Sequence, residues 1–165
     1  MSDSSLGGKV RANRVEVSKF EKHAYKSFYE PNEVIVDMRF LETLRHDQSS
    51  WGLAEIVKHA IYQSTSLLNY LLSDSFNPKI PQSLLKAILW CADLKRVCLE
   101  VDPEESREGS YKILRAGHDV SDKIEEKSHF TVSHGEAVWK GMEIDLKTDP
   151  TQYMYFQKLQ EKLFP

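Results

Sequence analysis

The chain has 165 residues, of which 41% are hydrophobic and 28% are charged, enough for one globular domain with a buried core. Its formal net charge is −3, with acidic and basic residues interspersed, so it lacks the basic field of a nucleic-acid-binding protein. No apolar run approaches the roughly 20 residues of a membrane span, and "MSDSSLGGK" lacks a signal-peptide core. We therefore expect no nucleic-acid partner, no membrane partner and a cytoplasmic location.

Residues 1–37 are predicted to contain short strands. "GGKVRANRVEV" alternates apolar and polar residues, and "EVIVD" is a β-branched run after Pro31. From residue 38 the pattern becomes helical. In "WGLAEIVKHAIYQSTSLLNYLL" apolar residues recur along one stripe at helical spacing, which predicts a single helix.

Further helices are expected along the rest of the chain. "FNPKIP" is a predicted loop leading into a helix that starts near Pro81 and ends at Asp102-Pro103. Short helices are expected to begin near Gly117 and Gly135, with a last one over about 152–163. The predicted fold is mainly α, with a small β-containing N-terminal segment (1–37) and a helical domain (38–165).

Two cysteines lie on the predicted helix that starts near Pro81. Cys91 and Cys98 are seven residues apart, about two turns, and too distant for a disulfide within one helix. We expect both to be reduced, buried thiols.

Glu55 lies one helical turn from both Lys58 and His59, on the polar flank of the predicted helix. One interpretation is a surface ion pair with no further role. The other is that Glu55 gives a carboxylate to a site and Lys58 holds an anion beside it. The helix alone does not decide between them.

Three histidines, at 118, 129 and 134, follow near the C-terminal end. His118 and His134 are sixteen residues apart, too far for a pair on one helix, so they meet only if the chain folds back. A carboxylate with two imidazoles is a common open coordination set for a divalent metal that acts as a Lewis acid. The alternative is that each histidine caps a helix or packs as an isolated polar residue.

Six ordered stretches resemble the sugar phosphate cyclases, the family of 3-dehydroquinate synthase and 2-epi-5-epi-valiolone synthase. They are "DSSLGGKVRAN", "FYEPNEVIVDMRFLETL", "GLAEIVKHAI", "LKRVCLEVDPEE", "AGHDVSDKIE" and "SHGEAVWKGM". The resemblance implies a helical metal-binding domain and a carbon–oxygen lyase of the shikimate-pathway type. Such enzymes eliminate phosphate from a heptulose phosphate and close the ring by an intramolecular aldol step.

The resemblance also implies which residues serve the reaction. Glu55, His118 and His134 match the ligands of a catalytic divalent metal, zinc or cobalt. A further set of residues matches the family positions that act on or bind the sugar phosphate substrate. They are Lys58, Lys95 and Asp122 as catalytic groups, and Lys9, Asn13, Lys22 and Arg107 as substrate-binding groups.

Some positions depart from the family pattern. The dehydroquinate synthases carry "LNFGHTxGHAxE" where this chain has "ILRAGHDVSDKIE", so Arg115 replaces an asparagine and Asp122 a histidine. Asp122 could still accept a proton. The valiolone-type cyclases have serine where this chain has Ser121, which favours sedoheptulose 7-phosphate as an alternative substrate.

Family members are about twice this length, and NAD binds in the glycine-rich half before "DSSLGGK". We therefore expect the chain to be truncated, lacking that half and part of the C-terminus. By itself, the chain is not expected to bind NAD. A homodimer or a separate nucleotide-binding half is the expected partner, and an exposed surface is expected where that half would pack. The alternative function is a non-catalytic remnant or regulatory fragment of the family.

Overall fold

The computed structural model describes residues 33–103 and 108–164 and, before them, the backbone of four short strands within residues 12–29. The helical part begins with a 3-10 helix, η2 (Met38–Leu41), and eight α-helices follow within the described residues. They are α1 (His46–Trp51), α2 (Leu53–Tyr62), α3 (Thr65–Leu72), α4 (Pro81–Val101), α5 (Glu108–Leu114), α6 (His118–Lys127), α7 (His134–Leu146) and α8 (Pro150–Leu163). The prediction of a mainly helical fold is confirmed.

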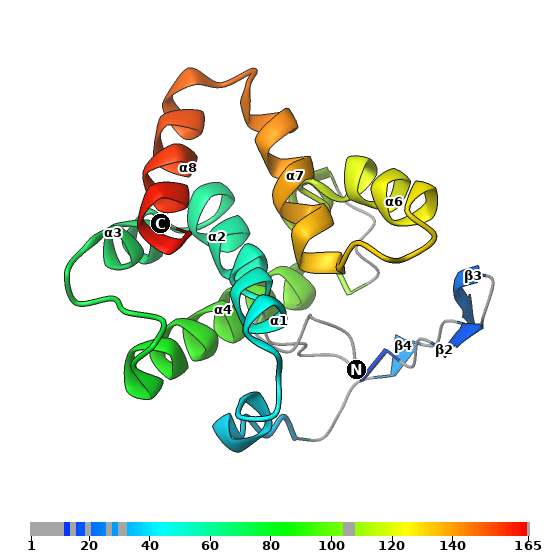
Figure 1. Cartoon of the computed structure of the whole chain (residues 1–165), viewed down its shortest axis with the longest axis horizontal. Coiled ribbons are helices and arrows are strands. Elements are labelled where there is room, and N and C mark those ends of the chain that lie inside the picture. The colour runs from blue at the N-terminus through cyan, green and yellow to red at the C-terminus, as the bar shows by residue number, and fades with distance from the viewer. Residues whose placement is uncertain are drawn as a thin grey trace.

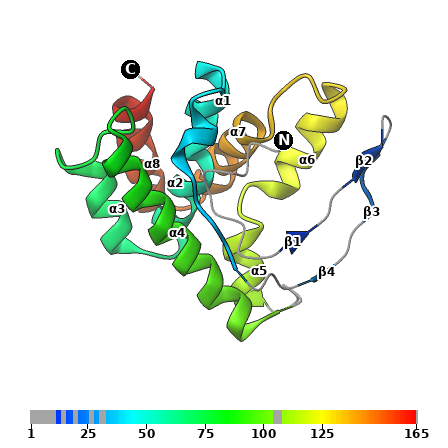
Figure 2. The same cartoon turned by 90° about the horizontal axis from the view of Figure 1, so that it is seen from below.

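The N-terminal strands form two small antiparallel pairs. They are β1 (Ala12–Asn13), β2 (Glu16–Ser18), β3 (Glu21–Tyr25) and β4 (Phe28–Tyr29). β1 pairs with β4, and β2 pairs with β3. In Figures 1 and 2 they lie beside the helices and not among them. The division of the chain into a β-containing N-terminal segment (1–37) and a helical domain (38–165) stays a prediction.

The strand expected at "EVIVD" does not form. Residues 33–37 have no regular secondary structure, and Val34 and Ile35 are 42% and 79% exposed. A β-branched run becomes a strand only when a neighbouring strand pairs with its backbone, and the two described strand pairs, β1–β4 and β2–β3, do not include this segment.

The helix expected over residues 51–72 is instead divided into α1, α2 and α3. α1 ends at Trp51, and Gly52 separates it from α2. Ser64 then begins a new helix, because its hydroxyl accepts a hydrogen bond from the Leu67 amide, 3.2 Å away. The apolar spacing continues through both breaks, which explains why the pattern predicts one helix.

The other helix boundaries follow their sequence signals. α4 begins with Pro81 at its first position, where a missing amide hydrogen costs nothing, and ends at Val101 before Asp102. α6 follows Gly117, as predicted. Cys91 and Cys98 are buried thiols that are not joined in a disulfide, also as predicted. Within the described residues, none of the helices combines the length and the apolar character needed to cross a membrane.

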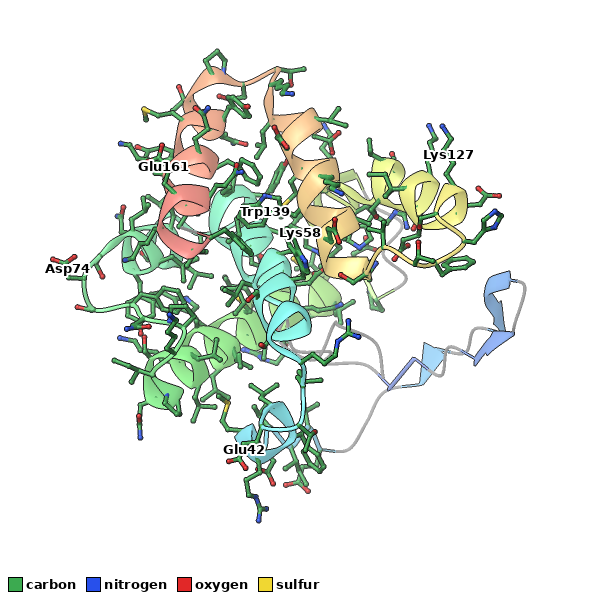
Figure 3. All side chains as sticks on the ribbon, viewed as in Figure 1. Glu42, Lys58, Asp74, Lys127, Trp139 and Glu161 are labelled. Atoms are coloured by element: carbon green, nitrogen blue, oxygen red, sulfur yellow. The ribbon has the colours of Figure 1, made fainter. Side chains whose placement is uncertain are left out.

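α2 lies at the centre of the helices, where α1, α3, α4, α5, α7 and α8 all contact it (Figure 1). Its buried residues extend around the whole helix and include Lys58 and His59. Figure 3 shows Lys58 in the middle of the molecule, whereas the labelled acidic residues and Lys127 lie at the periphery. The core is therefore built around a helix that carries charge.

An aromatic cluster fixes α7 against α1 and α8. The ring centroids of Trp139 lie 4.6 Å from Phe156 and 4.7 Å from Phe164, and Trp51 stacks on Phe164 at 4.9 Å. Such pairs contribute about 0.5–1.5 kcal/mol each beyond their buried area. This packing holds the N-terminal end of α7 beside α1 and α2.

Candidate metal centre

Glu55 lies in the first turn of α2 and its side chain is only 12% exposed. The ammonium of Lys58, 3% exposed, lies 2.5 Å from Glu55 Oε2 and donates a second hydrogen bond to the Leu114 carbonyl at 3.0 Å. The interpretation of Glu55 and Lys58 as a surface ion pair is therefore wrong. Lys58 and His59 are buried because six helices pack around α2, and helical spacing alone cannot reveal this.

The Glu55 carboxylate stays charged in this environment. Burial alone would raise its pKa, but the Lys58 ammonium, followed by His118 and His134, outweighs burial and holds the pKa well below the usual range. The anion that Lys58 holds is thus Glu55 itself. The buried pair presents an ionised carboxylate whose second oxygen, Oε1, faces the two histidines.

His118 is the first residue of α6, and the turn before it brings α6 close to α7. Gly117 has a φ of 76°, and a Cβ on it would meet the Met142 amide nitrogen of α7 at 2.8 Å, so only glycine fits here. The Gly117 amide also donates to Asp145 Oδ2 at 2.9 Å. The position of His118 is therefore fixed by backbone packing against α7.

The His118 ring is oriented by a hydrogen bond from Nδ1 to the Ala116 carbonyl at 3.1 Å. Because a carbonyl only accepts, Nδ1 carries the hydrogen and Nε2 keeps a lone pair. Burial and the Lys58 ammonium lower the pKa of His118 to about 4, so the ring is neutral at pH 7. A neutral imidazole is the form that binds a metal.

His134 is the first residue of α7. Ser133 precedes it as the N-cap, and its hydroxyl accepts from the Glu136 amide at 3.3 Å. A Cβ at Gly135 would collide with the backbone carbonyl of Trp51, so glycine is needed for α7 to approach α1. His134 Nδ1 lies 2.9 Å from Oε1 of the buried Glu125 carboxylate on α6.

Glu55, His118 and His134 come together from three helices. Glu55 Oε1 is 3.8 Å from His118 Nε2 and 3.8 Å from His134 Nε2, and the three ligand atoms all lie within 4.8 Å of one another. Within the described residues, no other group of three His, Cys, Asp or Glu side chains has this proximity.

The donor set fits a divalent metal. In a tetrahedral zinc site with bonds of about 2.0–2.1 Å, ligand atoms lie roughly 3.3–3.4 Å apart. The two 3.8 Å separations from Glu55 Oε1 to the histidine Nε2 atoms exceed this spacing by only about half an ångström. Three protein ligands with mixed nitrogen and oxygen donors leave a coordination position for a substrate oxygen.

Lys95 and Asp122 lie near the cluster without joining it. Lys95 is half-buried on α4, and its charge contributes to lowering the pKa of His59 on α2, after larger effects from burial and Lys58. Asp122 is one turn after His118 on α6. Its carboxylate lies 3.2 Å from the Arg115 guanidinium, so the two residues that depart from the family pattern pair with each other.

The predicted substrate-binding residues are not placed by the structure. Lys9 and Arg107 lie outside the described residues, and only the backbone of Asn13 and Lys22 is described, in β1 and β3. Their roles stay predictions.

His129 lies in the turn after α6, with an exposed side chain and a φ of 50°. It is not part of the three-residue cluster, and the resemblance did not match it to a metal ligand.

The sequence interpretation missed Glu125 and His59. Glu125 is seven residues after His118, two turns along α6. That spacing indicates that the two side chains lie on the same face of the helix, and it could have identified Glu125. His59 had been assigned to a polar flank, but it is 1% exposed and its Nδ1 lies 2.7 Å from Gln63 Oε1.

Comparison with known proteins identifies the family of the helical part of the chain. The sequence profile of the family described as 3-dehydroquinate synthase C-terminal matches residues 52–163. The 3-dehydroquinate synthase of Sulfurisphaera tokodaii is 32% identical over 150 residues, covering 89% of this chain and 41% of that protein. The corresponding figures are 34% over 143 residues for Alkaliphilus metalliredigens (85% and 38%) and 31% over 170 residues for Clostridium tetani (98% and 44%). The chain thus spans about two-fifths of the length of these relatives.

Proposed function

Because the chain belongs to the 3-dehydroquinate synthase family, through its C-terminal domain, we propose that it forms the metal-binding and substrate-binding side of a sugar phosphate cyclase. The reaction class is a carbon–oxygen lyase that eliminates phosphate from a heptulose phosphate and closes a carbocycle. The observation that carries the proposal is the convergence of Glu55, His118 and His134 within 4.8 Å.

Glu55 Oε1 and the Nε2 atoms of His118 and His134 would hold the ion, zinc or cobalt. Bound there, a divalent metal supplies Lewis-acid polarisation of substrate oxygens. The side chains around it support this role, because the other donor or acceptor atom of each ligand is already engaged. Lys58 holds Glu55 Oε2, and hydrogen bonds hold Nδ1 of both histidines.

The neighbouring polar residues are proposed to act on the substrate. The Lys58 ammonium has three hydrogens and, among the described residues, donates two to Glu55 and Leu114; we propose that the third binds a substrate oxygen. Lys95 is proposed to bind a substrate anion, and Asp122 to accept a proton. Lys9, Asn13, Lys22 and Arg107 are proposed to bind the sugar phosphate.

The proposed reaction also requires NAD and a nucleotide-binding part, which the described residues do not include. We propose that they come from sequence outside this chain or from a separate subunit that carries the nucleotide-binding half, and that a homodimer is the alternative partner. Exposed apolar residues support such a contact: Ile35 is 79% exposed and Phe40 68%. The two residues are five apart in the sequence, and exposed apolar patches mark interaction sites in many proteins.

A second candidate is a family member that binds the metal without turnover. The pairing of Arg115 with Asp122 favours it, because the carboxylate proposed to accept a proton is already held by a guanidinium. Ser121, which had suggested sedoheptulose 7-phosphate, is buried and donates to the His118 carbonyl at 3.2 Å. Its hydroxyl therefore gives that alternative no support as a substrate contact.

Metal analysis tests the proposed site. After dialysis against limiting zinc, the unmodified chain should retain a single zinc ion, and Glu55→Gln and His134→Ala should lose it. The matched control is His129→Asn, which changes the exposed histidine and keeps a residue that tolerates positive φ. Equal zinc content in all four proteins would refute the site.

Turnover tests the reaction. The chain is assayed with NAD and a heptulose phosphate, with and without a separately supplied nucleotide-binding half of a relative. Phosphate release that requires Glu55 supports the cyclase, and metal binding without phosphate release in either assay supports the second candidate.

A further inference from the structure

We infer that Glu125 is a positioning residue that fixes the ring of His134 and directs its Nε2 atom toward the metal. This inference rests on the proposed function, because it assigns a task to a residue outside the ligand set.

The contact is short and shielded from water. Glu125 Oε1 lies 2.9 Å from His134 Nδ1, and the Glu125 side chain is 5% exposed. A buried carboxylate is costly unless a donor compensates it. With its hydrogen on Nδ1, His134 donates to this carboxylate, and the Nε2 lone pair is left facing Glu55 Oε1.

The contact also joins two helices at the site. Glu125 is on α6, which begins with His118, and His134 begins α7. One helix thus supplies a ligand at its first residue and, two turns later, the carboxylate that orients the ligand of the next helix. Ser128 and Thr131 order the intervening turn, since Thr131 Oγ1 donates to the Ser128 carbonyl at 2.7 Å.

The two histidines are held in different ways. His118 Nδ1 bonds to the carbonyl of Ala116, two residues earlier, so local backbone orients it. His134 depends on a side chain from another helix, which a substitution can remove. Histidine ligands oriented by carboxylates lose about 10- to 100-fold in metal affinity when the carboxylate is changed.

Zinc affinity, measured by competition with a chelator on the full chain, tests the inference. Glu125→Ala should weaken zinc binding by about 10- to 100-fold, and Glu125→Gln, which keeps an oxygen acceptor, should weaken it less. The matched control is Glu126→Gln, which removes the same charge from the adjacent exposed position and should leave affinity unchanged. Unchanged affinity in a folded Glu125→Ala protein would overturn the inference.

The tautomer of His134 gives a readout that does not need metal. In the metal-free chain, nitrogen chemical shifts should show His134 with its hydrogen on Nδ1, and Glu125→Ala should move it largely to Nε2. If His134 has the same tautomer in the unmodified chain and in Glu125→Ala, the inference is overturned. If the unmodified chain binds no zinc, the proposed function fails, whereas normal zinc affinity without Glu125 refutes only the positioning role.

Discussion

Two helices of this molecule carry ion pairs between residues one turn apart, in opposite surroundings. On α2, Lys58 and Glu55 have side chains 3% and 12% exposed, enclosed by other helices. On α4, Arg96 contacts Glu100 and Asp93, and these side chains are 49%, 60% and 75% exposed. Sequence spacing is nearly the same in both cases. The surrounding helices make one pair part of a candidate metal centre and leave the other as a feature of the surface.

The largest expected effect comes from breaking the buried pair. Lys58→Met leaves the Glu55 carboxylate buried without its cation, so the free energy of unfolding of the metal-free chain should fall by about 3–5 kcal/mol. Arg96→Met on α4 removes an exposed cation and should cause no measurable change. Urea unfolding with a chelator present measures both, and equal losses would contradict the contrast between the helices.

The buried face of α2 should also make stability depend on pH through His59. Burial, followed by the Lys58 ammonium, lowers the pKa of His59 to about 4 from 6.5. As the pH falls below about 6.5, the unfolded chain takes up this proton first, so stability is lost down to about pH 4, by on the order of 3 kcal/mol. Below that pH the folded imidazole is protonated too, and the loss from this group levels off.

Substitution isolates the His59 contribution. Urea unfolding at pH 7.5 and 4.5 should show a smaller difference for His59→Gln than for the unmodified chain. His129→Asn, which changes the exposed histidine after α6, should keep the difference. An unaltered pH dependence in His59→Gln would assign the effect to other groups.

Backbone packing between α6 and α7 gives a third contrast. A Cβ at Gly141 would collide with the backbone carbonyl of Gly117, next to His118, whereas no atom of the described part of the chain lies within 4 Å of a Cβ at Gly109 in α5. Gly141→Ala should therefore cost about 1–3 kcal/mol and weaken zinc binding, because α6 must shift. Gly109→Ala should be neutral or slightly stabilising. Thermal unfolding with and without zinc compares them, and a neutral Gly141→Ala would contradict the close approach.

The smallest effect is expected between Arg115 and Asp122. Their side chains are 33% and 40% exposed, so screening by water limits their coupling to about 0.2–1 kcal/mol. A double-mutant cycle with Arg115→Met and Asp122→Asn measures it by urea unfolding. A coupling as large as the loss expected for Lys58→Met would show that this pair belongs to the buried region instead.

The sequence was most informative where a residue acts locally. Pro81, Asp102 and Gly117 mark helix boundaries correctly, because fixed φ, a capping position and a left-handed turn act within a few residues. The division of residues 51–72 into three helices was missed, because the apolar stripe continues across Gly52 and Ser64.

The candidate site was predictable only in part. Spacing left His118, His129 and His134 equally eligible as ligands, and only the resemblance separated the first and last from His129. The burial of Lys58 and the contact of Glu125 with His134 arise when α7 packs on α2 and α6 packs on α7. Such contacts depend on tertiary packing, which periodicity in one helix does not encode.

The most direct test of the metal centre is anomalous X-ray scattering from a crystal of the chain grown with zinc. The account predicts one peak at the zinc absorption edge, bounded by Glu55 Oε1 and the Nε2 atoms of His118 and His134. An absent peak, or a peak bound by other residues while these three side chains keep their positions, would contradict it.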